Sequence, residues 1–147
     1  MERIRTTVIA FALFACASGA GAVERPSDRI RRDSPKGITE AFYACIDEAK
    51  FSDIDKAYCV SQERERQDRR LNASYQALLH KLDGDRKKNV IEAERAWLKW
   101  QDKTSQVESA LYGSELMGNL EVTENEAFAL CRQANQLDEY LALANEL

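Results

Sequence analysis

The chain has little of the residue chemistry on which metal sites and many enzymes depend. It contains one histidine, His80, and no Cys-x-x-Cys pair, which argues against a zinc site. It has no glycine-rich phosphate loop and no nucleophile-elbow pattern. Alternation with a period of two, typical of a strand, is also missing. We therefore predict a protein without cofactor or metal that performs no reaction, in which His80 is a partly exposed surface residue.

Prolines and long apolar runs are equally scarce. Both prolines, Pro26 and Pro35, fall in the charge-rich stretch 23–36. That composition is typical of a flexible linker, because it offers too little apolar surface to fix its own shape. After the first 22 residues no apolar segment is long enough to cross a membrane.

Residues 1–22 have the pattern of a cleaved secretory signal. Arg3 and Arg5 form a basic start, residues 8–17 are apolar, and an Ala-Gly-Ala cleavage site ends at Ala22. The expected location of the mature protein is therefore the periplasm or the exterior of the cell.

A second processing route involves a lipid anchor. Residues 13–16 resemble a bacterial lipoprotein box in which Cys16 is the acylated residue. We favour soluble export, because Phe14 is bulky where small or aliphatic residues are usual.

The charge balance is mildly acidic. The whole chain has 21 Lys and Arg and 25 Asp and Glu; the leader holds Arg3, Arg5 and Glu2, so cleavage leaves 19 against 24, a net charge of −5. A nucleic-acid partner would need a basic face and is not expected. Such acidity is compatible with a cationic protein partner, and it also simply keeps an exported protein soluble.

The spacing of the cysteines predicts a disulfide that joins the first two helices, which we call the staple. Cys45 and Cys59 lie seven residues either side of Ser52, which falls in the turn predicted for this region. Ser52 or Asp53 is the expected N-cap of the next helix. Residues equidistant from a turn face each other in antiparallel helices, so this pair is our preferred disulfide, which requires an oxidising compartment. Cys131 is then a buried free thiol, an intermolecular link, or the true partner of one of the other two.

Apolar side chains recur at helical spacing in four segments, and we predict an all-α fold. The segments are residues 38–49, about 54–82, 90–112 and 127 to the C-terminus. Short connections favour antiparallel neighbours in a bundle-like domain over residues 37–147, with the first two helices joined by the disulfide.

Three local features complete this prediction. Residues 62–70 are almost wholly charged or amide and are interpreted as a solvated surface. Trp97 and Trp100 are interpreted as core aromatics of the third helix. A capping box at residues 123–126 predicts the start of the last helix. The loop before it, residues 113–119, presents Glu115, Leu116 and Met117 between glycines as a candidate partner contact.

An ordered set of residues resembles the LprI-type lysozyme inhibitor-like family of small, exported, all-helical bacterial proteins. Two cysteines lead into an acidic residue and a Leu-Asn-x-x-Tyr helix, an aromatic helix follows, and a last cysteine lies on the C-terminal helix. The matching residues are Cys45, Cys59, Asp68, Leu71, Asn72, Tyr75, Trp97, Asp102 and Cys131. Apolar packing and one hydrogen bond explain the motif. Leu71 and Tyr75 share a helix face, and Asn72 is placed to form a hydrogen bond with a neighbouring helix or loop.

The chain departs from the family pattern at several positions. Glu94 stands where glutamine is usual, Gln101 where arginine is usual, and Ser105 at the position of a third mature cysteine, so Cys131 has lost its partner by this alignment. Gln136 and Glu139 stand where a Thr-x-x-Arg pattern is expected. The fold should survive these changes, because Leu71, Tyr75 and Trp97 can still pack.

The resemblance implies an exported protein-binding domain that inhibits a lysozyme or another peptidoglycan-cleaving enzyme by steric blockade. A loop or helix edge bearing acids such as Glu115 or Glu121 would then cover a cationic cleft. Three alternatives remain: a periplasmic interaction or structural protein, an immunity protein against a toxin delivered into the periplasm, and an enzyme whose turnover depends on a carboxylate or on His80, which we do not expect.

Overall fold

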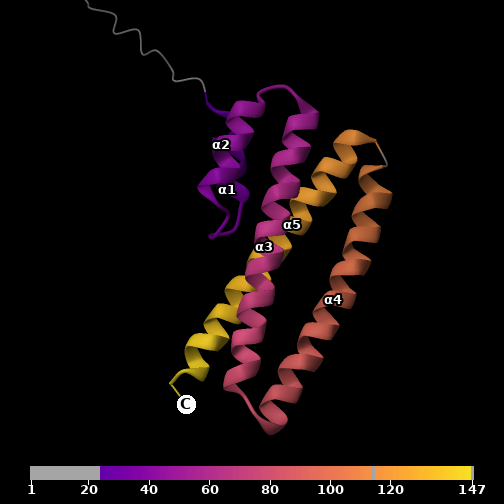
Figure 1. The fold of residues 1–147 in the computed structure, drawn as a ribbon. Coiled ribbons are helices and arrows are strands. Elements are labelled where there is room, and N and C mark those ends of the chain that lie inside the picture. The colour runs from indigo at the N-terminus through magenta and orange to yellow at the C-terminus, as the bar shows by residue number, and fades with distance from the viewer. Residues whose placement is uncertain (1–23, 114, 147) are drawn as a thin grey trace, which may run out of the picture.

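The computed structural model describes residues 24–113 and 115–146, and within them it contains five helices and no strand. In chain order they are α1 (Pro26–Asp33), α2 (Glu40–Ala49), α3 (Asp53–Lys81), α4 (Gly84–Tyr112) and α5 (Leu116–Ala144) (Figure 1). The all-α class is confirmed, with one helix more than predicted. The expected signal peptide over residues 1–22 and the candidate lipidation site Cys16 lie outside the described residues.

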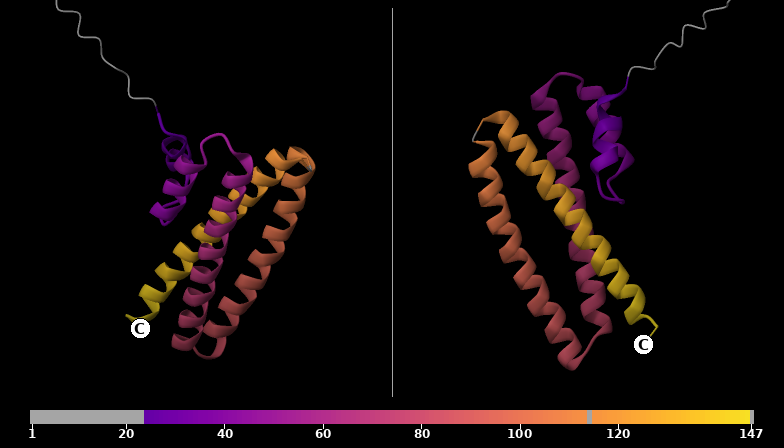
Figure 2. Two further views of the ribbon diagram at one scale, coloured as in Figure 1. Left: turned by 45° about the horizontal axis from the view of Figure 1, so that its top comes forward. Right: turned by 180° about the vertical axis from the view of Figure 1, so that it is seen from behind.

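Three long helices form the body of the molecule. The helices α3 and α5 cross and share the most extensive contact, α4 runs beside them and packs on α5, and α2 packs on α3 with α1 against it (Figures 1 and 2). The α2–α3 and α4–α5 turns lie at one end of the molecule, and the α3–α4 turn and the C-terminus lie at the other (Figure 1). Glu94 is the only buried residue of α4 among those the structure describes, so most of this helix faces solvent.

The apolar core has two parts. One part lies at the end of the molecule that holds the disulfide, where it joins α2, α3 and α5. Its buried members are Ile38, Phe42, Tyr43, Ile46, Ala49, Cys59, Val60, Phe128 and Cys131. The other joins α3 and α5 toward the C-terminus, with Leu71, Leu78, Leu130, Ala134 and Leu137 buried and Tyr75 and Trp97 partly buried against it. Burial of such apolar surface is the main stabilising contribution to the fold.

The predicted staple between the first two helices is present. Cys45 of α2 is bonded to Cys59 of α3, with 5.7 Å between their Cα atoms. Ser52 is the N-cap of α3, and its hydroxyl accepts a hydrogen bond from the Asp55 amide at 3.3 Å. Of the three alternatives for Cys131, the structure has the buried free thiol.

The stretch 23–36 differs from the linker we predicted, because α1 forms within it. Pro26 begins the helix, where a missing N–H is harmless. Ser27 anchors it on α2, donating from its amide and its hydroxyl to the Asp47 carboxylate at 3.0 and 2.8 Å. The Arg31 guanidinium lies 3.7 Å from the centre of the Tyr43 ring. Long-range polar contacts therefore fix a segment whose own apolar content is small.

The interpretation of residues 62–70 as a solvated surface was wrong at two positions. Glu63 is 0% exposed and Gln67 is 1% exposed. The Glu63 carboxylate accepts hydrogen bonds from the Thr39 amide at 3.0 Å and the Thr39 hydroxyl at 2.6 Å, and Gln67 donates to the Gly37 carbonyl at 2.9 Å. These polar side chains hold the α1–α2 connection against α3.

The last helix begins earlier than predicted. It starts at Leu116, so residues 123–126 form no capping box; the Thr123 hydroxyl instead donates to the Asn119 carbonyl within the helix at 2.7 Å. Most of the predicted loop is therefore helical. On α4, Trp97 is partly buried, but Trp100 is 59% exposed, which contradicts its predicted place in the core.

Candidate functional site

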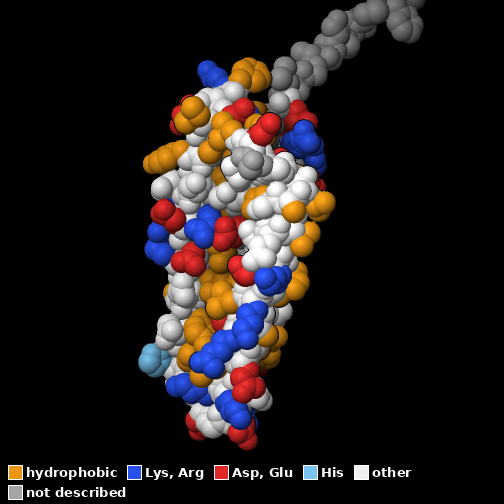
Figure 3. Space-filling view, turned by 90° about the vertical axis from the view of Figure 1, so that its right-hand side faces the viewer, with side chains coloured by type: hydrophobic (Ala, Val, Ile, Leu, Met, Phe, Trp, Pro, Cys, Tyr) orange, Lys and Arg blue, Asp and Glu red, His pale blue; other side chains and the backbone are white. Residues whose placement is uncertain are grey.

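The α4–α5 turn presents an exposed apolar tip with acids beside it. We define the hairpin tip as Leu111, Tyr112, Glu115, Leu116 and Met117, all of which are exposed; Leu111 is 79% exposed. Figure 3 shows hydrophobic side chains gathered at this end of the molecule. Exposed apolar side chains that cluster in this way mark interaction surfaces.

Two glycines shape this turn. Gly113 ends α4 with φ of 84°, a left-handed conformation that glycine adopts without strain. Gly118 lies so close to the end of α4 that a Cβ atom there would come within 2.6 Å of the Gly113 carbonyl oxygen. The close approach keeps the hairpin tight, so the side chains of the tip point outward.

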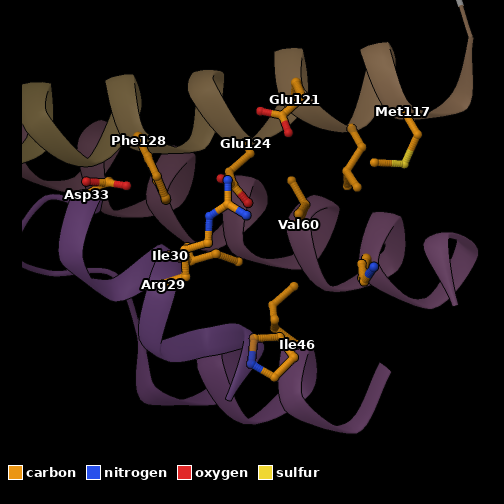
Figure 4. A pocket seen from close by; sticks show the side chains of 12 residues that line it. Arg29, Ile30, Asp33, Ile46, Val60, Met117, Glu121, Glu124 and Phe128 are labelled. Atoms are coloured by element: carbon orange, nitrogen blue, oxygen red, sulfur yellow. The ribbon is translucent and has the colours of Figure 1, made fainter. Parts of the chain in front are cut away.

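A pocket of about 380 Å³ adjoins the hairpin tip. We call it the acid pocket. Residues of α1, α2, α3 and α5 line it, with apolar walls made by Ile30, Ile46, Val60, Leu120 and Phe128. Met117 belongs to both the tip and the pocket, and Glu121 projects from α5 into the pocket (Figure 4). Three residues predicted as partner contacts thus lie on the tip, and the fourth, Glu121, lies in the pocket.

The charged groups of the acid pocket are unevenly balanced. Asp33, Glu121 and Glu124 face Arg29 and Lys56. Lys56 is already engaged, because its ammonium lies 3.1 Å from the Asp53 carboxylate on its own helix. Glu124 has no hydrogen bond or ion pair with any described residue, and burial, together with the neighbouring charge of Glu121, raises its pKa to about 7. A partly buried acid without a partner is typical of a binding site.

Replacing Glu124 with glutamine should therefore stabilise the protein at high pH. The folded-state pKa lies above the ordinary 4.5, so the carboxyl favours folding below 4.5 and loses that contribution as the pH rises through about 7. At pH 8 we expect the free energy of unfolding of Glu124→Gln to exceed that of the parent by about 2 kcal/mol. This figure is smaller than the full pKa shift corresponds to, because Glu124 is partly exposed and solvent screens its charge. At pH 4 the two should agree. Urea unfolding at both pH values measures this, with exposed Glu139→Gln on the same helix as the control; equal stabilities at pH 8 would contradict it.

The family-motif residues meet at a second place. Asp68, Leu71, Asn72 and Tyr75 of α3 and Trp97 of α4 line a small cleft of about 140 Å³ over Leu130 of α5. Asn72 donates to the Asp68 carbonyl on its own helix at 2.9 Å, and not to a neighbouring element. Asp102 lies outside the cleft and accepts a hydrogen bond from Gln106 at 2.9 Å. The motif therefore chiefly packs α4 onto the α3–α5 pair.

One departure from the family pattern, Glu94, lies in this cleft. Glu94 is buried in the cleft, where Gln133 donates to it at 2.8 Å, and burial raises the pKa of its carboxyl. Gln101 is partly buried on α4. Ser105, which stands at the position of the third mature cysteine, lies on α4. The Cys131 thiol forms no disulfide and donates to the Lys36 carbonyl at 3.4 Å.

Fold and site together define a small, disulfide-bridged helical domain with an exposed apolar and acidic tip, the class of a protein-binding module. Among residues 24–113 and 115–146 no group of histidines, cysteines and acids is arranged to hold a metal ion. No helix in that part of the chain is long and apolar enough to span a membrane.

The chain matches the family model described as Lysozyme inhibitor LprI over residues 45–143, and it belongs to this family. The match begins at the first disulfide cysteine and ends near the end of α5, so it includes the hairpin tip and excludes α1. It confirms the resemblance found in the sequence. No match was found among curated proteins or among solved structures.

Proposed function

We propose that this protein is an exported binding domain that inhibits a lysozyme or a related peptidoglycan-cleaving enzyme by covering its active-site cleft with the hairpin tip. The observation that carries the proposal is the exposed apolar cluster at the α4–α5 turn, because a soluble domain gains nothing in stability from leaving Leu111 and Leu116 in water. Family membership supplies the kind of target.

The tip has the composition of a protein contact. Apolar and aromatic side chains at the centre of an interface contribute most of the binding free energy, and charged groups at its rim steer the encounter. At the tip, Leu111, Tyr112, Leu116 and Met117 supply the apolar centre, and Glu115 supplies an acid that attracts a cationic cleft. The disulfide would keep the domain folded in an oxidising compartment outside the cytoplasm.

Replacing Leu111 and Leu116 together with serine should weaken inhibition at least about tenfold, the effect of losing one or two central apolar contacts. Leu111 is 79% exposed and Leu116 is 48% exposed, and neither belongs to the buried core, so the fold should be retained. The measurement is residual hydrolysis of bacterial cell walls by lysozymes of several classes over a range of inhibitor concentrations.

Leu143→Ser is the matched control, because Leu143 is 60% exposed at the opposite end of the molecule. It should change inhibition less than about twofold. If the parent protein inhibits no lysozyme class at micromolar excess, the inhibitor proposal is overturned in favour of an interaction or immunity protein.

A further inference from the structure

We infer that the acid pocket receives one lysine or arginine side chain of the protein partner, with the aliphatic stem against the apolar walls and the cationic group between Glu121 and Glu124. The inference deepens the proposed function and rests on it for the identity of the partner. It concerns a different surface from the hairpin tip, joined to it by Met117.

The size and walls of the pocket fit such a side chain. About 380 Å³ is within the range of sites that bind small molecules, and it is larger than one basic side chain requires. Ile46 and Val60 form walls from α2 and α3, and Phe128 extends the apolar lining along α5 (Figure 4). Lysine and arginine stems pack well on surfaces of this kind while their charged ends reach polar groups.

The charges in the pocket select a cation. Glu121 and Glu124 are three residues apart on α5, so both carboxylates project from one face of the helix into the pocket (Figure 4). Asp33 adds a third acid from α1. Against them stand Arg29 on α1 and Lys56 on α3, of which Lys56 is paired with Asp53; the α2 contribution to the lining, Ile46, is uncharged.

Other occupants fit less well. An anion would meet the carboxylates of Glu121 and Glu124, and among the described lining residues Arg29 alone would offer it an unpaired positive charge. A neutral apolar group would cover Glu124 without providing a partner, which increases the penalty of burying its charge. A cationic group relieves the repulsion between the two carboxylates and supplies the partner that Glu124 lacks.

Binding of a cation in the acid pocket should depend on whether Glu124 is protonated. Glu124 with a pKa of about 7 is protonated in a large fraction of molecules at neutral pH, and a cation binds best to the ionised form. Affinity should therefore rise by up to about tenfold between pH 6 and pH 8, as Glu124 ionises.

The test uses N-butylguanidinium as the cation and N-butylurea as a neutral analogue of the same shape, so it needs no lysozyme. Amide shifts in two-dimensional NMR spectra of the purified protein report binding at pH 6 and pH 8. We expect N-butylguanidinium to perturb the amides around Val60, Glu121 and Glu124, to bind up to about tenfold more tightly at pH 8, and to exceed N-butylurea at both pH values.

Two variants locate the effect. In Glu124→Gln the pH dependence should disappear and binding at pH 8 should weaken by about tenfold, whereas exposed Glu139→Gln should behave as the parent. Equal binding of the neutral analogue, equal affinity at both pH values, or shifts confined to another surface would each overturn the inference. Because these outcomes do not depend on inhibition, a pocket that binds the guanidinium in a protein that inhibits no lysozyme refutes only the proposed function.

Discussion

Removing the Cys45–Cys59 disulfide by replacing both residues with alanine should lower the free energy of unfolding by about 3 kcal/mol. The bond closes a segment with a sequence separation of 14 residues, and releasing a loop of that size returns about this much conformational freedom to the unfolded chain. For a domain of this length the loss corresponds to a fall in Tm of about 10 °C.

Loss of the disulfide should first destabilise the helices nearest to it and only then the whole domain. The staple joins α2 to α3, and α1 contacts the rest of the fold chiefly through α2. Without the bond, hydrogen exchange should accelerate first in α1 and α2, while the α3–α5 pair stays protected. Hydrogen exchange followed by mass spectrometry measures the order of opening.

Reduction provides the control. Dithiothreitol should lower the Tm of the parent and of Cys131→Ala by the same amount, because Cys131 is a free thiol that contributes no crosslink. It should leave the double alanine variant unchanged. A parent protein whose Tm does not respond to reduction would contradict the role assigned to the staple.

The sequence carried local signals for the features that depend on neighbouring residues. Ser52 marks the start of α3, and the spacing of Cys45 and Cys59 around it identifies the bridge, because turn and helix geometry are set by residues close together in the chain. Gly113 similarly marks the end of α4. The tip residues Leu116 and Met117 were predicted as partner contacts for the same reason, since they follow that stop.

Features that depend on distant residues were missed. The helix α1 is held by Asp47, which lies 20 residues from Ser27, and no pattern within the stretch 23–36 reports that contact. Thr123 was misread as a cap because its motif fits one, whereas Gly118 allows the helix to begin earlier beside α4. The acid pocket combines four helices, so its lining has no signature in any one segment.

Glu63 is the strongest case of such a distant contact, and replacing it with glutamine should lower the free energy of unfolding by about 3 kcal/mol at pH 7. Its carboxylate is fully buried and accepts from the amide and hydroxyl of Thr39, from Gln67 at 2.7 Å and from Arg66 at 2.9 Å. Glutamine has one oxygen and one NH₂ group at these positions, so a donor would face donors and buried groups would lose their partners.

The pH dependence of this loss has a defined sign. Burial opposes ionisation of Glu63, but its hydrogen bonds outweigh burial and hold the pKa of the carboxyl below its ordinary 4.5. Such a group stabilises the folded state above its ordinary pKa, and that contribution is lost as the pH falls through the lowered folded-state value. The stability difference between the parent and Glu63→Gln should therefore be full at pH 7 and should narrow below about pH 4.5.

A matched control lies two residues along the same helix. Glu65 is exposed and pairs with Arg69 across one turn at 3.6 Å, so Glu65→Gln should change stability by no more than about 0.5 kcal/mol. Urea unfolding of both variants at pH 7 and pH 4 separates the two cases. Equal effects at pH 7 would contradict the structural role assigned to Glu63, because Glu63 bonds Thr39 of the α1–α2 connection whereas Glu65 pairs only within its own helix.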